Sequence, residues 1–87
     1  MQDKRKELQI ALGKTVKALR KDISINRLAH EIDLSKSIWS ELEKGRKDIQ
    51  LSTLWKIAEA LEVSPSELLR QVELSLEENF SFIETTI

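Results

Sequence analysis

The segment from residue 25 to residue 44 constrains the fold most, because its pattern suits two short helices that cross at a steep angle. Such a crossing needs a small side chain where the helices meet, and Ala29 stands there. The turn between them needs a left-handed backbone, which Asp tolerates at some cost, so we expect Asp33 to adopt it. Apolar residues occupy the inward positions Leu28, Ile32, Leu34, Trp39 and Leu42. These features predict a helix-turn-helix unit.

Apolar stripes at helical spacing predict three further helices around this unit. The first is expected from about residue 3 to residue 21, with an inner face of Leu8, Leu12, Val16 (or Thr15) and Leu19. The fourth is expected to bury Leu54, Ile57, Ala58 and Leu61. The fifth is expected to bury Leu68, Leu69 and Val72.

Capping residues mark where these helices begin and end. Pro65 at a first helical position, with Glu67 completing a capping box, predicts the start of the fifth helix. Gly45 is expected to end the third helix in a left-handed conformation. The expected N-caps of the second to fifth helices are Ser24, Ser35, Ser52 and Ser64.

Length and composition agree with an all-α chain. Its 87 residues suffice for one domain with a modest core, and two Gly, one Pro and 33% charged residues favour helices over strands. The chain has no Cys, which excludes disulfides and thiolate metal sites and fits a cytoplasmic protein. Apolar residues are dispersed, so we expect no membrane span and no signal peptide. We assign residues 1–72 to the helix-turn-helix domain and residues 73–87 to a C-terminal extension.

The C-terminal extension permits two readings. Leu74, Leu76, Phe80 and Phe82 alternate as they would in a strand, whereas Leu69, Val72 and Leu76 fit a continuing helix. A segment this apolar is expected to pack on the domain or on a second subunit, unless it is a frayed terminus.

Charge is divided unevenly between the two halves of the chain. Residues 1–47 hold twelve Lys and Arg against seven Asp and Glu, a net charge of +5. Residues 48–87 hold two against eight, a net charge of −6. A basic half that meets phosphates while the acidic half faces away would reconcile nucleic-acid binding with a net charge of −1.

Three stretches of the chain resemble the Cro and repressor type of helix-turn-helix proteins, the XRE family. They are LGKTVKALRK, SINRLAHEIDLSKSIWSELEKGRK and LSTLWKIAEALEVSPSELL, within residues 12–69. The resemblance implies a five-helix, lambda-repressor-like bundle that binds double-stranded operator DNA as a homodimer and regulates transcription. The small size also resembles the controller proteins of restriction-modification systems, which the sequence does not separate from phage repressors.

The resemblance assigns recognition of base edges to the third helix, residues 36–44. Its N-terminal end is expected to enter the major groove. The matching base contacts are Lys36, Ser37, Ser40 and Glu41, although Glu41 is equally well read as a solvated residue. Phosphate contacts are expected at Asn26, Arg27, Ser35, Lys44, Arg46 and Lys47.

The family pattern also assigns structural roles. Arg20 and Glu43 match a buried ion pair between the first and third helices. Trp55 is expected either in the core or at the dimer interface, and we place Phe80 and Phe82 with it at that interface. Three features depart from the pattern: Ile25 replaces a phosphate-binding Gln, Ile49 replaces Pro, and the turn at residues 21–23 is short.

An enzyme is not expected. His30 is the one histidine, no Cys could act with it as a nucleophile, and no Gly-rich phosphate loop occurs. We predict no cofactor, no metal and no catalytic residue. The alternative function is a protein-interaction module, such as an antitoxin, whose partner binds the acidic and apolar extension.

Overall fold

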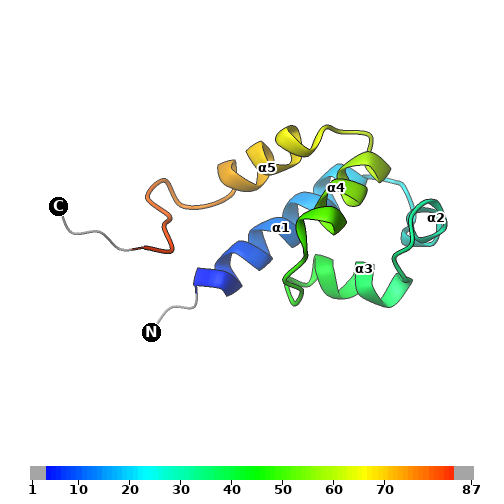
Figure 1. The fold of residues 1–87 in the computed structure, drawn as a ribbon, viewed down its shortest axis with the longest axis horizontal. Coiled ribbons are helices and arrows are strands. Elements are labelled where there is room, and N and C mark those ends of the chain that lie inside the picture. Colours follow the sequence, from blue (N-terminus) through cyan, green and yellow to red (C-terminus); the bar gives the residue numbers. More distant parts are fainter. Residues whose placement is uncertain (1–3, 84–87) are drawn as a thin grey trace.

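The computed structural model describes residues 4–83, and within them five helices form a bundle (Figure 1). They are α1 (Lys4–Arg20), α2 (Ile25–Glu31), α3 (Lys36–Glu43), α4 (Leu51–Ala60) and α5 (Pro65–Leu74). The described residues include no strand, and the expected all-α five-helix bundle is confirmed.

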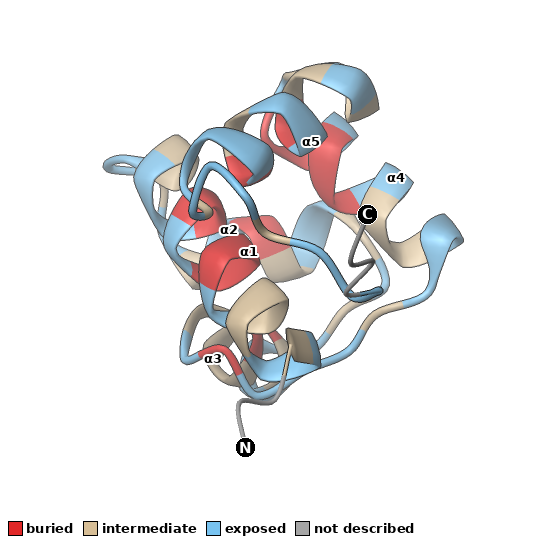
Figure 2. Ribbon diagram, turned by 90° about the vertical axis from the view of Figure 1, so that its left-hand side faces the viewer, coloured by how far each residue is buried: buried red, intermediate tan, exposed pale blue. Residues whose placement is uncertain are grey.

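Helix α1 lies at the centre of the arrangement. It packs against α3 on one side and α5 on another, while α2 packs on α3 and α4 packs on α5. The buried stretches of the helices face one another across the interior (Figure 2). Six large side chains are fully buried there: Val16, Leu28, Trp39, Leu42, Ile57 and Leu68. Core and recognition unit are therefore continuous, because Leu28, Trp39 and Leu42 belong to both.

Trp39 was expected in the core, and it has no exposed surface. Its indole Nε1 has no hydrogen-bond partner, which costs roughly 1–3 kcal/mol for a buried donor. The apolar area of the ring offsets this cost.

Three of the four expected serine caps are present. The hydroxyls of Ser24, Ser35 and Ser64 accept hydrogen bonds from the backbone N–H groups three residues later, at 3.1, 3.3 and 3.1 Å. The expectation for Ser52 is wrong, since α4 begins at Leu51 and its N-cap, Gln50, makes no side-chain cap hydrogen bond.

Left-handed backbone occurs at helix ends, and only partly where expected. Gly45 adopts φ 74° after α3, as predicted, and Lys21 and Glu62 adopt φ 52° and 62° after α1 and α4. The expectation for Asp33 is wrong, because its φ is not positive. Ile32 is extended instead, and the N–H of Leu34 donates to the carbonyl of Ile32 at 2.7 Å, so a tighter turn of negative φ joins α2 to α3.

The C-terminal extension follows neither of the two regular patterns. Helix α5 ends at Leu74, and the described residues beyond it contain turns but no strand. Leu76 packs against the core, and the ring of Phe80 lies 5.5 Å from the ammonium of Lys4. Phe82 contacts Phe80 edge to face at 5.6 Å. The extension thus packs on the domain through Leu76 and Phe80, while the division at residue 72 stays a prediction and residues 84–87 lie outside the described chain.

Candidate nucleic-acid interface

The N-terminal end of α3 presents the residues expected to read bases. Ser35 caps this end, and its hydroxyl lies 3.2 Å from that of Ser37. Lys36 and Ser37 are exposed, whereas Ser40 is half-buried. Because the first turn of a recognition helix is the part that reaches into the groove, Lys36 and Ser37 have the access that base contacts need.

Two of the expected DNA contacts pair with each other in the unbound chain. A carboxylate oxygen of Glu41 lies 3.4 Å from Nη1 of Arg46. The pair spans the end of α3 and the loop that follows it, with the Arg46 side chain 60% exposed and the Glu41 side chain 41% exposed. The Arg46 guanidinium thereby offsets the negative charge of Glu41 at the end of α3.

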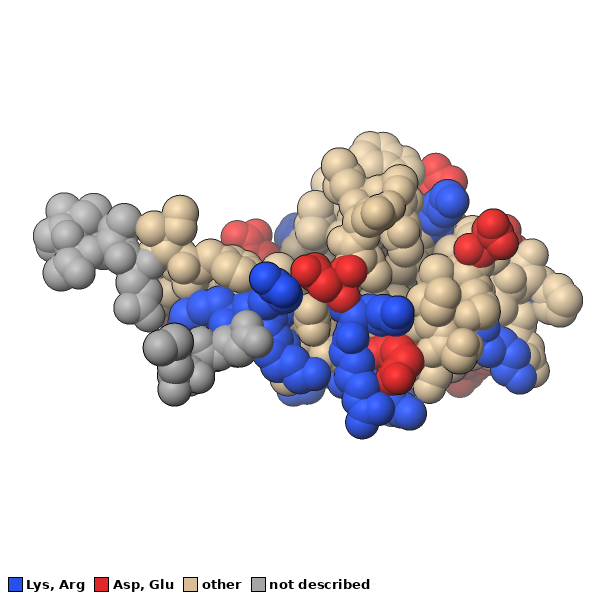
Figure 3. Space-filling model, turned by 60° about the horizontal axis from the view of Figure 1, so that its bottom comes forward, with Lys and Arg blue, Asp and Glu red and all other residues tan. Residues whose placement is uncertain are grey.

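Cations flank the recognition helix on both sides. Asn26 and Arg27 are exposed at the start of α2, where Arg27 lies 3.4 Å from Glu31. Lys44, Arg46 and Lys47 are exposed after α3. With the α3 side turned forward, Lys and Arg side chains gather where α1 begins and α3 ends (Figure 3).

The ion pair of Arg20 and Glu43 holds α3 against α1. Nε and Nη2 of Arg20 donate to the two carboxylate oxygens of Glu43 at 2.6 and 2.9 Å. Nη1 donates to the carbonyl of Ile23 at 3.0 Å, so one guanidinium joins α1, the following turn and α3. The hydrogen bonds that Arg20 donates to Glu43, and the negative charge of that carboxylate, raise the pKa of Arg20 against the opposing effect of burial.

Close helix packing supplies a second constraint on α3. A Cβ on Gly13 of α1 would lie 2.5 Å from the carbonyl oxygen of Leu42 and 2.8 Å from that of Glu43. The helices therefore approach more closely than any side chain would allow. The ion pair and this contact both fix the C-terminal turn of α3, which aligns its N-terminal turn for a partner.

The first turn of α1 lies beside the loop after α3, which the sequence reasoning missed. Nζ of Lys6 donates to the carbonyl of Gly45 at 2.8 Å, and Nε of Arg5 lies 3.8 Å from Asp48. Three successive cations at residues 4–6 were the available signal.

The candidate dimer residues lie in different environments. Trp55 is 52% exposed, so its alternative assignment to the core is wrong. Leu51, one turn earlier on α4, is 71% exposed, and Leu69, expected to be buried on α5, is 48% exposed. Leu69 also lines an apolar groove with Leu54. Phe80 is half-buried within its own chain, and Phe82 is exposed.

A metal site is absent from residues 4–83. This part of the chain holds no group of three or more His, Cys, Asp or Glu side chains that could bind a metal. None of its helices combines the length and apolar character needed to cross a membrane. His30 is exposed on α2.

The comparison with known proteins agrees with this geometry. Residues 15–73 match the Cro/C1-type HTH DNA-binding domain. The control protein C.MunI of Mycoplasma sp is 34% identical over 70 residues, 77% of this chain and 95% of that protein. The control protein C.BamHI of Bacillus amyloliquefaciens is 32% identical over 65 residues, 71% of this chain and 80% of that protein.

A solved structure has a similar fold. The clp gene regulator ClgR from C. glutamicum superposes with a TM-score of 0.75 at 30% identity, over 83% of this chain and 96% of that one. The chain belongs to the Cro/C1-type helix-turn-helix family. It is a DNA-binding regulator of transcription.

Proposed function

We propose that this chain is a sequence-specific regulator that binds operator DNA as a homodimer and reads the major groove with α3. The observation that carries the proposal is the exposed first turn of α3, with cations on both flanks and a rigid attachment to α1. A fixed helix with accessible polar side chains is what direct readout requires.

The contacts divide into two groups in this proposal. Lys36 donates to guanine O6 and N7, and the neighbouring contacts to base edges come from Ser37, Ser40 and Glu41. Contacts to phosphates come from Asn26, Arg27, Ser35, Lys44, Arg46 and Lys47. Glu41 and Arg46 pair in the unbound chain. Glu41 therefore contacts a base only after Arg46 has left it to bind a phosphate.

The homodimer forms through an apolar surface on α4 and α5 in this proposal. Leu51 and Trp55 are one turn apart and project from the same face of α4, and Leu69 adds exposed apolar area from α5. An exposed aromatic residue among aliphatic neighbours is typical of interface hot spots. Phe82 is a secondary candidate, whereas Phe80 already packs against its own chain.

The protein acts by binding alone, without catalysis or cofactor, and works in the cytoplasm with its DNA. The two relatives named as control proteins, of similar length, support a controller of its own transcription unit, such as a restriction-modification operon.

Fluorescence anisotropy with the DNA upstream of the gene tests the proposal. The wild-type chain should bind this duplex tightly and a scrambled duplex weakly, with an affinity that falls steeply as salt rises. Lys36→Glu combined with Lys47→Glu should abolish specific binding without changing the helical circular dichroism. If this double variant binds as well as wild type, the recognition surface is wrongly assigned.

A protein partner for the extension is the second candidate function. The observation that favours it is the exposure of Phe82 and Ile83, 55% and 72%, at the end of an acidic segment. A small basic protein encoded beside the gene should then co-purify with the full chain. It should be lost from the Phe82→Ser variant if the extension binds it.

A further inference from the structure

The first turn of α1 carries three successive cations that lie outside the family match. Lys4, Arg5 and Lys6 open the helix, whereas the match to the DNA-binding domain begins at residue 15. These cations thus lie N-terminal to the part of the chain that the family model matches.

The turn is attached to the loop that we assign to phosphate contacts. Nζ of Lys6 lies 2.8 Å from the carbonyl oxygen of Gly45, the residue between Lys44 and Arg46. Nε of Arg5 lies 3.8 Å from Asp48, and both side chains of that pair are about two thirds exposed, 68% and 65%. The cations of α1 thus lie beside those of the loop, with acidic side chains among them (Figure 3).

Helix stability does not explain this placement. The N-terminal end of a helix carries a partial positive charge, which disfavours cations in the first turn. Glu7 is the acidic residue of the first turn of α1, against three cations. Cations in the first turn of a helix depart from this electrostatic preference, and such departures are expected where function requires them. A helix end and several cations together attract a polyanion.

We infer that Arg5 and Lys6 bind backbone phosphates on the flank of the operator, next to those bound by Lys44, Arg46 and Lys47. This inference rests on the proposed function and extends the DNA interface to a third element. In this arrangement Lys6 reaches a phosphate from its position beside the carbonyl of Gly45. Arg5 leaves the exposed carboxylate of Asp48 and pairs with a phosphate instead.

The salt dependence of binding tests the inference. Each phosphate contact contributes about 0.9 to the slope of log K against log salt concentration. Arg5→Gln combined with Lys6→Gln should therefore reduce the slope by about 1.8, on both the operator and a scrambled duplex. Asp48→Asn removes the competing carboxylate and should raise the affinity for both duplexes.

The matched control removes two charges elsewhere. Lys14 is exposed on the side of α1 that faces α5, and Lys56 is exposed on α4. Lys14→Gln combined with Lys56→Gln should leave the slope close to that of wild type. If the two double variants have equal slopes, Arg5 and Lys6 make no phosphate contact and the inference is wrong.

Three single variants separate phosphate binding from structural support of the loop. Arg5→Gln alone should keep the melting temperature and reduce the slope by about 0.9, since its exposed pair contributes little to stability. Lys6→Arg keeps the charge and the donor and should keep the slope. A Lys6→Gln variant that melts earlier but keeps the full slope would make Lys6 a structural residue only and contradict the inference.

Failure of this inference can be distinguished from failure of the proposed function. The Arg5 and Lys6 double variant should still prefer the operator over the scrambled duplex, because phosphates carry no sequence information. Loss of that preference on Lys36→Glu with Lys47→Glu supports the recognition surface independently of α1.

Discussion

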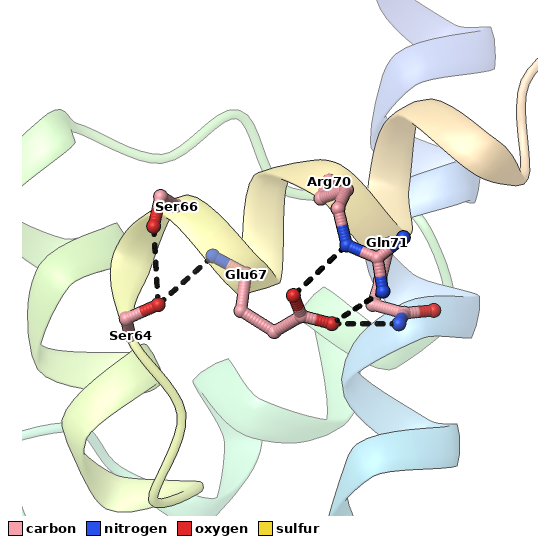
Figure 4. A network of polar contacts seen from close by, with 5 residues as sticks. All are labelled: Ser64, Ser66, Glu67, Arg70 and Gln71. Carbon is pink, nitrogen blue, oxygen red and sulfur yellow. Dashed lines mark hydrogen bonds and ion pairs between the residues drawn. The ribbon is translucent and has the colours of Figure 1, made fainter.

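Two arginine–glutamate pairs in this molecule share one geometry and differ in their surroundings. Arg20 and Glu43 form two hydrogen bonds of 2.6 and 2.9 Å between residues 23 positions apart, with side-chain exposures of 18% and 9%. Arg70 and Glu67 form two of 2.9 Å within one turn of α5, with exposures of 58% and 38%. Gln71 donates a third hydrogen bond to Glu67 at 2.8 Å (Figure 4).

The difference teaches that burial, more than distance, decides what such a pair does. In water the exposed pair gains little, because solvent screens the charges and two mobile side chains must be ordered. Between packed helices, the loss of one partner leaves the other charge without water and without a counterion. The first pair therefore controls the position of the recognition helix, and the second orders one turn of α5.

Glu43→Gln is expected to have the largest effect. It leaves the Arg20 guanidinium mostly buried without its counterion, at a cost of about 3–5 kcal/mol. For a domain of this size, that should lower the melting temperature by more than about 10 °C. The matched substitution, Glu67→Gln, should leave the melting temperature nearly unchanged. Equal shifts in thermal denaturation would show that burial does not separate the two pairs.

Gly13→Ala tests the same α1–α3 contact without touching a charge. In an exposed helix this change is stabilising, since Ala is the better helix former. Here the added Cβ would lie 2.5 Å from the backbone oxygen of Leu42, so the helices must separate. We expect a loss of about 1–3 kcal/mol in chemical denaturation. A gain in stability would mean that α1 and α3 do not pack this closely.

The pH dependence of Glu67 tests the more exposed of the two ion pairs, that of Arg70 and Glu67. The hydrogen bond from Arg70, followed by that from Gln71, lowers the pKa of Glu67 from 4.5 to about 2. Because the pKa is lower in the folded chain, its stabilisation is present above 4.5 and is lost as the pH falls toward about 2.

The effect is expected to be small, because Glu67 is accessible to solvent. NMR titration of its side-chain carboxyl carbon should give a midpoint well below that of an unpaired glutamate. Arg70→Gln should raise this midpoint toward the ordinary value. A midpoint that is near 4.5 in the wild-type chain would show that the pair does not persist in solution.

The sequence by itself determined the features that depend on near neighbours. The caps at Ser24, Ser35 and Ser64 each need one hydroxyl and an N–H three residues later. The positive φ of Gly45 is likewise open to any glycine, although the close approach of Ile10 to this residue is a tertiary contact. The apolar spacing of residues 25–44 likewise predicted the helix-turn-helix unit, because a steep crossing leaves few alternatives. The residues that the family pattern assigns to the DNA are accessible apart from half-buried Ser40 and Glu41.

Tertiary structure decided what depends on the direction of the next element. Glu62 is left-handed because α5 must turn back onto α1, whereas Asp33 is not, because an extended Ile32 already redirects the chain. The capping box predicted at Glu67 does not close, because its carboxylate accepts hydrogen bonds from Arg70 and Gln71 and not from the backbone N–H of Ser64.

The contact of α1 with the loop after α3 also depends on tertiary structure. Lys6 and Gly45 are 39 positions apart, and no local pattern relates them. Nor does periodicity show that Leu69 and Trp55 stay exposed, since an apolar residue on a helix face is buried only if another element covers that face. The sequence determined the helices and their inner faces, and packing between distant segments determined which side chains remained available for a partner.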